Sequence, residues 1–447
     1  MADTEKKSIV IVGGGIIGCS TAYFLTRHSK YNPDVHSIHL LEATGIASGA
    51  SGKAGGLLAL WAYPQSIVPL SFKLHAELAK EHGGAERWGY RGVGVGQIEL
   101  KGRQITGKEK VIAQKGAVDG AASDGNGHAD GKGEDIRGIH QQDVASDGNF
   151  DPSRVSLQKR SKDSYKNLRS MGMPDDLDWT AEECTLGYES MGSPKDTAQV
   201  HPYQFTTSMA RLAEEKGARV IIGAVDKIET GSGDAPEHTV HYTDRNSNST
   251  QTLKATNVII TAGPWTKTVW PGTPISALRA HSVTIRPSRP VSPYCLFTSL
   301  SLPKNFKAGT KSRASHVTPE IYARPNNELY ACGEGDHLVP LPKSSADVVV
   351  DDSRCQDIVD CCASFSDEMR DGSVLVRQAC YLPQVETGSG PLVGLTGTKG
   401  VLMAAGHTCW GIQNGPGTGK LMSEFVFDGE GTSANVRALD PRRVLRT

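Results

Sequence analysis

An apolar stretch that runs into a glycine-rich turn near the start of the chain constrains its fold more than any other feature. Residues 9–12 are all Ile or Val, Gly13, Gly15 and Gly18 follow them, and a helical pattern begins at Ile17. A strand, turn and helix of this kind direct the free N–H groups of the first helical turn at a phosphate, and the helix dipole adds to the attraction. The glycines allow the tight turn, the approach of a pyrophosphate and the close contact of helix with strand. The stretch predicts binding of a dinucleotide.

A carboxylate and a loop of small residues follow at positions that fit this prediction. The next apolar stretch, residues 37–42, ends on Glu42, which is placed to hold ribose hydroxyls and would repel a 2′-phosphate. Residues 45–56 are mostly small and carry a single charge, on Lys53. A segment with so little bulk is unable to pack a core and is too long for a turn. We therefore expect it to wrap a ligand.

The overall charge and the cysteines exclude several classes of protein. The 447 residues suit two or three domains, and a formal net charge of −1 gives no reason to expect nucleic acid as a partner. No apolar stretch reaches membrane-spanning length, and we expect no signal peptide because the first strand follows the N-terminus directly. The nine cysteines are an odd number scattered among apolar neighbours, and their one cluster has no zinc-site spacing. We expect reduced thiols, no metal and a cytoplasmic protein.

The composition changes between residues 106 and 151. Residues 116–135 hold almost no side chain able to bury, so we expect a disordered insert at 106–151, for which docking of a protein partner is an alternative role. Elsewhere the apolar periodicity predicts helices and strands. The expected helices are 67–78, 155–168, one that starts at 201–202, and 418–427; the expected strands are 219–223, 257–263, 294–297, 321–323, 329–332 and 401–405, with a polar hairpin at 238–254.

Four stretches together resemble the D-amino-acid-oxidase-like (DAO) family of FAD-dependent oxidoreductases, which includes glycine oxidase and the monomeric sarcosine oxidases. The four stretches are the glycine turn with Glu42, the loop 47–56, residues 261–265 and residues 406–420. They follow one another in the order that is typical of the family. The resemblance covers nearly the whole chain except the insert. A P-loop at 415–420 is excluded, because Leu421 replaces the Ser or Thr that such a loop requires.

Three further stretches are similar to a fungal branch of this family that is linked to endosomal trafficking; they are residues 50–58, 278–283 and 332–335. This similarity implies peripheral association with late endosomes. The family resemblance implies an α/β fold, α+β overall, with a Rossmann-type FAD-binding domain and a second, antiparallel-sheet substrate domain. The expected FAD-binding domain comprises residues 1–83, 181–270 and 397–447, and the expected substrate domain comprises 84–180 and 271–396.

When the family's contacts with FAD are carried over by position, the resemblance implies that they lie along most of this chain. The glycine turn would hold the pyrophosphate, Glu42 the adenosine ribose, and residues 51–53 the edge of the flavin. The last loop and helix would direct N–H groups at the pyrimidine end of the flavin, where they stabilise the negative charge of the reduced ring. The expected FAD-binding residues are Gly13, Gly15, Ile16, Ile17, Gly18, Glu42, Ala43, Ser51, Gly52, Lys53, Val225, Gly263, Trp265, Gly406, Gly411, Ile412, Gln413, Asn414 and Gly415.

The substrate side departs from the better-known members of the family. The arginine with which glycine oxidase holds the substrate carboxylate falls at Leu382, and the sarcosine oxidases place a lysine where Gln413 stands. A carboxylate buried without a cationic partner costs several kcal/mol. The substrate is therefore either not a small α-amino acid or is anchored by other groups. The resemblance favours Arg324 and Arg279 as substitutes, although Arg324 fits equally well as a salt bridge at a sheet edge.

Family chemistry is hydride transfer from the carbon next to an amine, which needs a neutral amine and good alignment. A histidine can accept the amine proton near neutral pH, and a protonated histidine or Lys53 can stabilise superoxide. For each histidine, a hydrogen-bonded core side chain is an equally good interpretation. The expected catalytic residues are His281, Tyr322, Arg324, His407 and Trp410.

Cys380 falls where the sarcosine oxidases carry the cysteine that bonds to flavin. A buried cysteine is commonly a small hydrophobe, and a strand thiol needs local help to become a thiolate. We therefore expect non-covalent FAD. Residues 329–333 hold no lysine, although the sarcosine oxidases use one there to activate oxygen.

The sequence thus favours an FAD-dependent enzyme that oxidises a C–N bond of an amine or modified amino acid, with O₂ as acceptor and H₂O₂ as product. Two alternatives stay open. One is a flavin-stabilised interaction protein of endosomal membrane traffic with little turnover, and the other is a flavin dehydrogenase that uses another electron acceptor.

Overall fold

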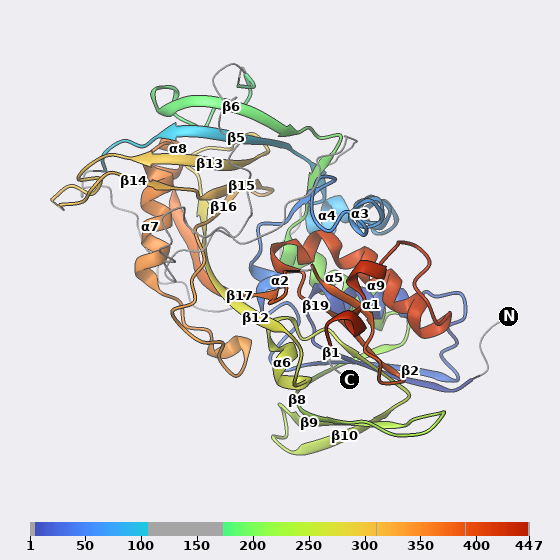
Figure 1. Cartoon of the computed structure of the whole chain (residues 1–447). Coiled ribbons are helices and arrows are strands. Elements are labelled where there is room, and N and C mark those ends of the chain that lie inside the picture. The colour runs from blue at the N-terminus through green and yellow to red at the C-terminus, as the bar shows by residue number, and fades with distance from the viewer. Residues whose placement is uncertain (1–4, 106–172, 310, 389, 446–447) are drawn as a thin grey trace.

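The computed structural model describes residues 5–105, 173–309, 311–388 and 390–445. Two large sheets, each assembled from distant parts of the chain, dominate it (Figure 1). The expected insert at 106–151 and the expected helix at 155–168 lie outside the described residues. The α/β fold with several sheets that the sequence indicates is confirmed.

The first sheet has a parallel centre and antiparallel edges. Its order is β10-β9-β8-β2-β1-β11-β19-β18, with β8, β2, β1, β11 and β19 parallel. Ile9 and Ile11 of β1 are buried on one face, and Val10 and Val12 on the other, as is typical of a parallel sheet covered on both sides. The strands are β1 (Lys7–Val12), β2 (His36–Glu42), β8 (Ala218–Glu229), β9 (His238–Asp244), β10 (Thr250–Ala255), β11 (Asn257–Ile260), β18 (Leu392–Leu395) and β19 (Val401–Ala405).

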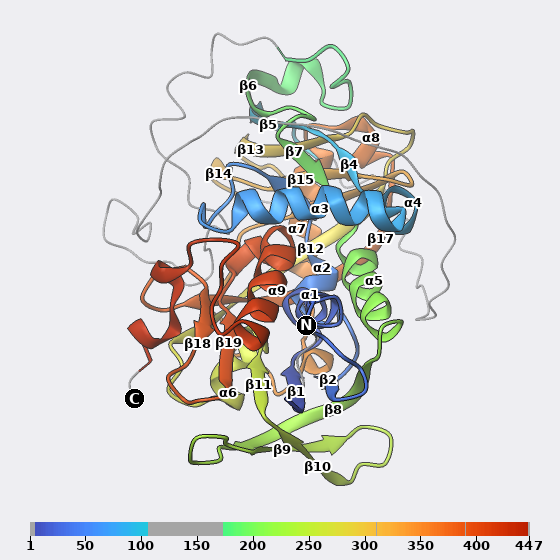
Figure 2. The same ribbon diagram turned by 90° about the vertical axis from the view of Figure 1, so that its right-hand side faces the viewer.

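Helices α1 (Ile16–Leu25), α5 (Pro202–Glu214) and α9 (Gly411–Phe427) pack on the face that carries Ile9 and Ile11, and α3 (Val68–His82) crosses over them (Figure 2). In the parts of the chain that the structure describes, no helix has both the length and the apolar character needed to cross a bilayer. The remaining α-helices are α2 (Ala50–Lys53), α4 (Gly84–Trp88), α6 (Thr266–Val269), α7 (Asp352–Ala363) and α8 (Asp367–Arg370).

The second sheet is mainly antiparallel and has the order β17-β12-β16-β15-β13-β5-β6, with β14 paired to β13 and one parallel pair, β13 with β5. Helix α7 packs on it through an apolar face that holds the buried thiols of the cysteine cluster, Cys355, Cys361 and Cys362. The strands are β5 (Gly94–Lys101), β6 (Thr185–Gly192), β12 (Ile275–Arg286), β13 (Tyr294–Leu302), β14 (Ser315–Val317), β15 (Glu320–Arg324), β16 (Glu328–Cys332) and β17 (Ser373–Val385).

The described residues also form a small third sheet, and two strands pair differently from what the expected domain bounds imply. It is formed by β3 (Leu57–Ala59), β7 (Thr197–Gln199) and β4 (Arg91–Gly92). Strand β6 was expected in the first domain but pairs with β5 in the second sheet, and β18 was expected in the second domain but pairs with β19 in the first. Backbone pairing decides this membership, across the insert for β5 and β6 and between consecutive strands for β18 and β19, and it leaves no mark in local composition.

Helix α9 begins at Gly411, seven residues before the expected 418, although Pro416 lies inside it. Proline has no N–H and removes the helical hydrogen bond to the carbonyl four residues earlier. That carbonyl, of Ile412, instead lies 3.0 Å from Nε2 of His75 on α3, and the next N–H, of Gly417, donates to Ser71 Oγ at 2.7 Å. Two side chains one turn apart on α3 therefore hold the first turns of α9.

We predict that His75→Leu lowers the free energy of unfolding by about 1–3 kcal/mol, because it leaves the buried Ile412 carbonyl without a donor. Urea unfolding followed by circular dichroism measures the change. His75→Gln, which keeps an N–H donor, should recover part of the loss, and Lys73→Ala on the exposed face of the same helix is the control. A His75→Leu protein as stable as the wild type would contradict the assignment.

Candidate functional site

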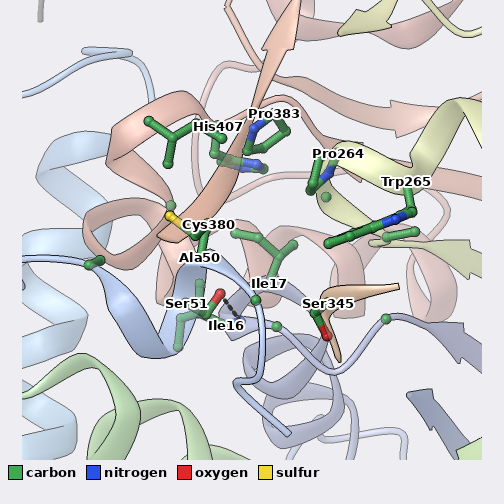
Figure 3. A pocket seen from close by; sticks show the side chains of 18 of the residues that line it. Ile16, Ile17, Ala50, Ser51, Pro264, Trp265, Ser345, Cys380, Pro383 and His407 are labelled. Carbon is green, nitrogen blue, oxygen red and sulfur yellow. Dashed lines mark hydrogen bonds between the residues drawn. The ribbon is translucent and has the colours of Figure 1, made fainter. Parts of the chain in front are cut away.

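A cavity lies where the carboxyl ends of the parallel strands face the second sheet (Figure 3). Parallel α/β sheets bind ligands at this edge. The first sheet contributes the ends of β1, β2 and β19, and the second contributes residues of β12, β15, β16 and β17. Seventeen of the sequence-predicted residues line the cavity: Gly13, Gly15, Ile16, Ile17, Glu42, Ala43, Ser51, Lys53, Val225, Gly263, Trp265, Gly406, His407, Trp410, Gly411, Ile412 and Tyr322.

The glycine turn is closed by contacts that exclude a side chain. Gly13 has φ +114°, and a Cβ there would lie 2.5 Å from the Thr261 carbonyl oxygen. A Cβ on Gly18 would lie 2.0 Å from the carbonyl oxygen of Gly13, so this residue brings α1 against the turn and does not line the cavity. The N–H of Ile16, at the start of α1, donates to Ser51 Oγ at 2.9 Å (Figure 3).

Glu42 joins the glycine turn to the loop that follows β2. Its carboxylate accepts hydrogen bonds from the N–H of Gly14 at 2.8 Å and from the N–H of Thr44 at 3.0 Å. Thr44 and Ser48 both hydrogen-bond through their hydroxyls to Ser345, at 2.5 and 2.7 Å. Ser345 lines the cavity, and no sequence signal pointed to it because 297 residues separate it from Ser48.

The other end of the cavity is lined by Tyr322, His407 and Trp410, and also by Glu320, which sequence reasoning passed over. The Tyr322 hydroxyl donates to the Glu320 carboxylate at 2.6 Å. His407 Nε2 lies 3.0 Å from Thr418 Oγ1, and burial lowers the pKa of His407 to about 3. Its imidazole is therefore neutral at physiological pH and a poor proton acceptor.

The expectation that His281 reaches this pocket is wrong. Successive strand residues point to opposite faces of a sheet. On β12 the cavity-lining residue is Ala280, paired with Cys380 on β17, so His281 lies on the other face. There its Nε2 accepts from the N–H of Asp351 at 3.1 Å, and burial, with the nearby charge of Arg279, lowers its pKa to about 4.

Neither arginine expected to anchor a carboxylate lines the cavity. Arg324 forms an ion pair with Glu328 at 2.7 Å and donates to the carbonyl oxygens of Ala54 and Gly55, so its structural interpretation is correct. Arg279 is buried against Asp336, with an N–O distance of 3.1 Å. Both guanidinium groups hold the protein's own carboxylates and loops.

Four more of the expected binding residues pack outside the cavity lining: Gly52, Gln413, Asn414 and Gly415. The Gln413 side chain accepts from the N–H of Ala59 at 2.7 Å, and the Asn414 amide donates to the Tyr63 carbonyl at 2.8 Å. These residues fix helix α9 to the segment after β3. Of helix α9, only the first two residues, Gly411 and Ile412, line the cavity.

Cys380 and Lys53 lie side by side in the lining. Burial raises the pKa of the Cys380 thiol to about 11, and the nearby ammonium of Lys53 lowers it only in part. Lys53 Nζ donates to the Ala379 carbonyl at 2.9 Å, and burial lowers the pKa of this ammonium group. The thiol is therefore protonated at neutral pH.

Buried histidines give a prediction for stability against pH. Burial lowers the pKa of His75 and His201 to about 4 and that of His407 to about 3, below the unfolded value of about 6.5. The unfolded chain therefore binds more protons, so the free energy of unfolding should fall as pH drops from about 6.5 toward 4. Each histidine contributes a slope of at most about 1.4 kcal/mol per pH unit.

Urea unfolding at a series of pH values, at constant cofactor content, measures this slope. His407→Gln should make it shallower between pH 6.5 and 4, because it removes one titrating group. Stability that rises on acidification through this window would contradict the prediction.

Curated relatives resemble this chain along its whole length. A protein of Saccharomyces cerevisiae named "Putative oxidoreductase TDA3" is 36% identical, over 98% of this chain and 94% of its own length. A protein of Schizosaccharomyces pombe named "Putative oxidoreductase C1F5.03c" is 33% identical, over 98% of each chain.

Solved structures share the fold. Glycine oxidase from Geobacillus kaustophilus matches with a TM-score of 0.63 and 18% identity, over 98% of this chain and 99% of its own. L-proline dehydrogenase from P. horikoshii matches with a TM-score of 0.61 and 15% identity, over 98% of each chain. Residues 8–425 match the family described as "FAD dependent oxidoreductase" (DAO). The chain therefore belongs to the DAO family of FAD-dependent oxidoreductases.

Proposed function

We propose that this enzyme oxidises the C–N bond of an amine or modified amino acid by hydride transfer to FAD, with O₂ as the acceptor and H₂O₂ as the product. A single cavity carries the proposal, because it joins the glycine turn and Glu42 to Glu320, Tyr322 and His407. A dinucleotide that spans it would bring its reactive ring to the second sheet. The glycine and amino acid oxidases among the solved structures support the fold of such an enzyme, and the substrate remains a proposal.

The N–H donors at the edge of the cavity and the open space beside Gly263 fit FAD. Two helix N-termini, those of α1 and α9, reach the lining; neither has a side-chain cap at its N-cap residue, and the Ile16 N–H of α1 donates to Ser51. Free N–H groups at such termini favour the negative charge of a pyrophosphate and of a reduced flavin. A Cβ on Gly263 would meet nothing within 4 Å, so backbone and cofactor can approach closely there. We assign the cofactor to the lining residues named above, with Glu42 and Ser345 toward the adenosine.

FAD bound in the cavity supplies the acceptor for a hydride. The protein's part is to orient the substrate carbon, exclude water and place charge. Tyr322 and Trp410 form the wall opposite the expected flavin position, and Lys53 is the cation placed to stabilise superoxide. His407, with a pKa of about 3, orients Thr418 rather than taking the substrate proton.

The proposal predicts that an amine reduces the bound flavin. The visible spectrum of the purified protein should show oxidised flavin and should bleach without oxygen when the right amine is added from a broad panel. Readmitted oxygen should restore the spectrum and yield H₂O₂. A flavin that stays oxidised with every amine and amino acid would refute the proposed reaction, and recovery only with an artificial acceptor would identify a dehydrogenase.

The high pKa of Cys380 predicts non-covalent cofactor. Acid precipitation should release all of the flavin into the supernatant, and Cys380→Ser should keep the wild-type flavin content. Flavin that stays with the precipitated wild type but is released from Cys380→Ser would overturn this prediction.

The domain bounds are proposed with two changes from the sequence expectation. We assign β18 to the FAD-binding domain and β6 to the substrate domain; the pairing of β18 with β19 and of β6 with β5 supports this assignment. A protein partner for the insert at 106–151, a cytoplasmic location and endosome association remain predictions from sequence, and the insert lies outside the described residues.

A further inference from the structure

A buried carboxylate stands at the substrate end of the cavity. Glu320, the first residue of β15, lines the cavity with a relative exposure of 7%, and the Tyr322 hydroxyl donates to it at 2.6 Å. The electric charge of Glu320 raises the pKa of the Tyr322 phenol and of the Cys409 thiol, in addition to the larger effect of burial. The charge of Glu320 therefore influences side chains on both sides of the cavity, Tyr322 on the second sheet and Cys409 in the turn before α9.

The cations of the described cavity lining are two lysines, Lys53 and Lys343, and both lie beside other parts of the lining than Glu320. No arginine is among the cavity-lining residues of the described chain. Lys53 donates to a backbone carbonyl beside Cys380, and Lys343 lies next to Pro342, whose carbonyl accepts from Trp265 toward the adenosine end. A substrate carboxylate placed near Glu320 would meet a like charge, which disfavours its binding.

Aromatic rings surround the same end of the cavity. Tyr322 lines the cavity and stacks on Tyr330 with a centroid distance of 5.8 Å. The Arg324 guanidinium already lies over the Tyr330 ring, 4.8 Å from its centroid, so Tyr322 is the ring of this pair that we assign to the substrate. Trp410, also in the lining, contacts Trp61 edge to face at 5.6 Å. Electron-rich ring faces attract cations, and a carboxylate next to them completes the usual environment for an ammonium group.

We propose that Glu320 and these rings bind the ammonium group of the substrate, which is a cationic amine with a hydrophobic substituent and without an α-carboxylate. This inference rests on the proposed function and narrows it from amines and amino acids to amines. Glu320 is also placed to take one ammonium proton: the N–H bond breaks, an O–H bond forms on Glu320, and the electron pair stays on nitrogen. The neutral amine that hydride transfer requires is the product of that step.

Binding to the full-length, FAD-loaded protein tests the proposal without turnover. Benzylamine, benzoate and phenylglycine are titrated without oxygen into protein whose FAD was reduced beforehand, so that no hydride transfer follows binding, and calorimetry gives the three dissociation constants. In the wild type, benzylamine should bind at least about tenfold more tightly than benzoate and phenylglycine. Equal or tighter binding of benzoate or phenylglycine would overturn the proposal.

Variants with measured flavin content separate the charge of Glu320 from its packing. Glu320→Gln should reduce the preference for benzylamine over benzoate by at least about tenfold, whereas Glu320→Asp should retain most of it. Glu430→Gln makes the same change at an exposed site and should bind as the wild type does. An unchanged preference in Glu320→Gln would refute the assignment. If Glu320→Gln loses FAD, the dissociation constants of the three ligands for the wild type and for Glu320→Asp decide between the outcomes.

The two proposals fail in different ways. Selective binding of benzylamine without flavin reduction by any amine would leave the ammonium site standing and refute the proposed oxidation. Flavin reduction by α-amino acids but not by amines that lack a carboxylate would support the oxidation and refute the ammonium site.

Discussion

The close contact of α1 with the glycine turn is the constraint on which the cavity depends. A Cβ on Gly18 would lie 2.0 Å from the Gly13 carbonyl oxygen, and real Cβ atoms essentially never approach so closely. Helix α9 in turn lies against α1 at Gly415 and Gly419, where a Cβ would come within 2.6 Å of Ile16 and 2.5 Å of Ser20. Gly415 thus makes room for the Ile16 side chain and Gly419 packs on the Ser20 backbone, and these contacts fix the relative position of the two helices whose first residues line the cavity.

The start of α9 is fixed from the opposite side by α3. Pro416 frees the Ile412 carbonyl, and His75 and Ser71 provide the replacement partners. The arrangement allows a proline within a buried helix because the missing hydrogen bond is made by a neighbouring element. Burial lowers the pKa of His75 to about 4 and keeps its imidazole neutral, although the hydrogen bonds to the backbone of α9 act in the opposite direction.

The alternation of strand residues decides the chemistry of the substrate end. On β12, Ala280 faces the cavity while Arg279 and His281 do not line it. On β15, Glu320 and Tyr322 face the cavity, and Arg324 turns to Glu328 and the loop after α2. At the substrate end, the described lining therefore has the Glu320 carboxylate and aromatic rings but no guanidinium, which favours a cation next to Glu320.

The sequence by itself determined the dinucleotide end, because its requirements are local: an apolar strand, Gly13, Gly15 and Gly18 at fixed spacing, and a carboxylate at the end of the next strand. It also predicted the α/β class and most of the elements. Only the tertiary structure decided the sheet to which β6 and β18 belong, the place of Ser345 beside Thr44, and the residues of β12 and β15 that face the cavity. These features depend on strand pairing, on register and, for Ser345 and Thr44, on contact between segments 301 residues apart, which no local pattern of residues specifies.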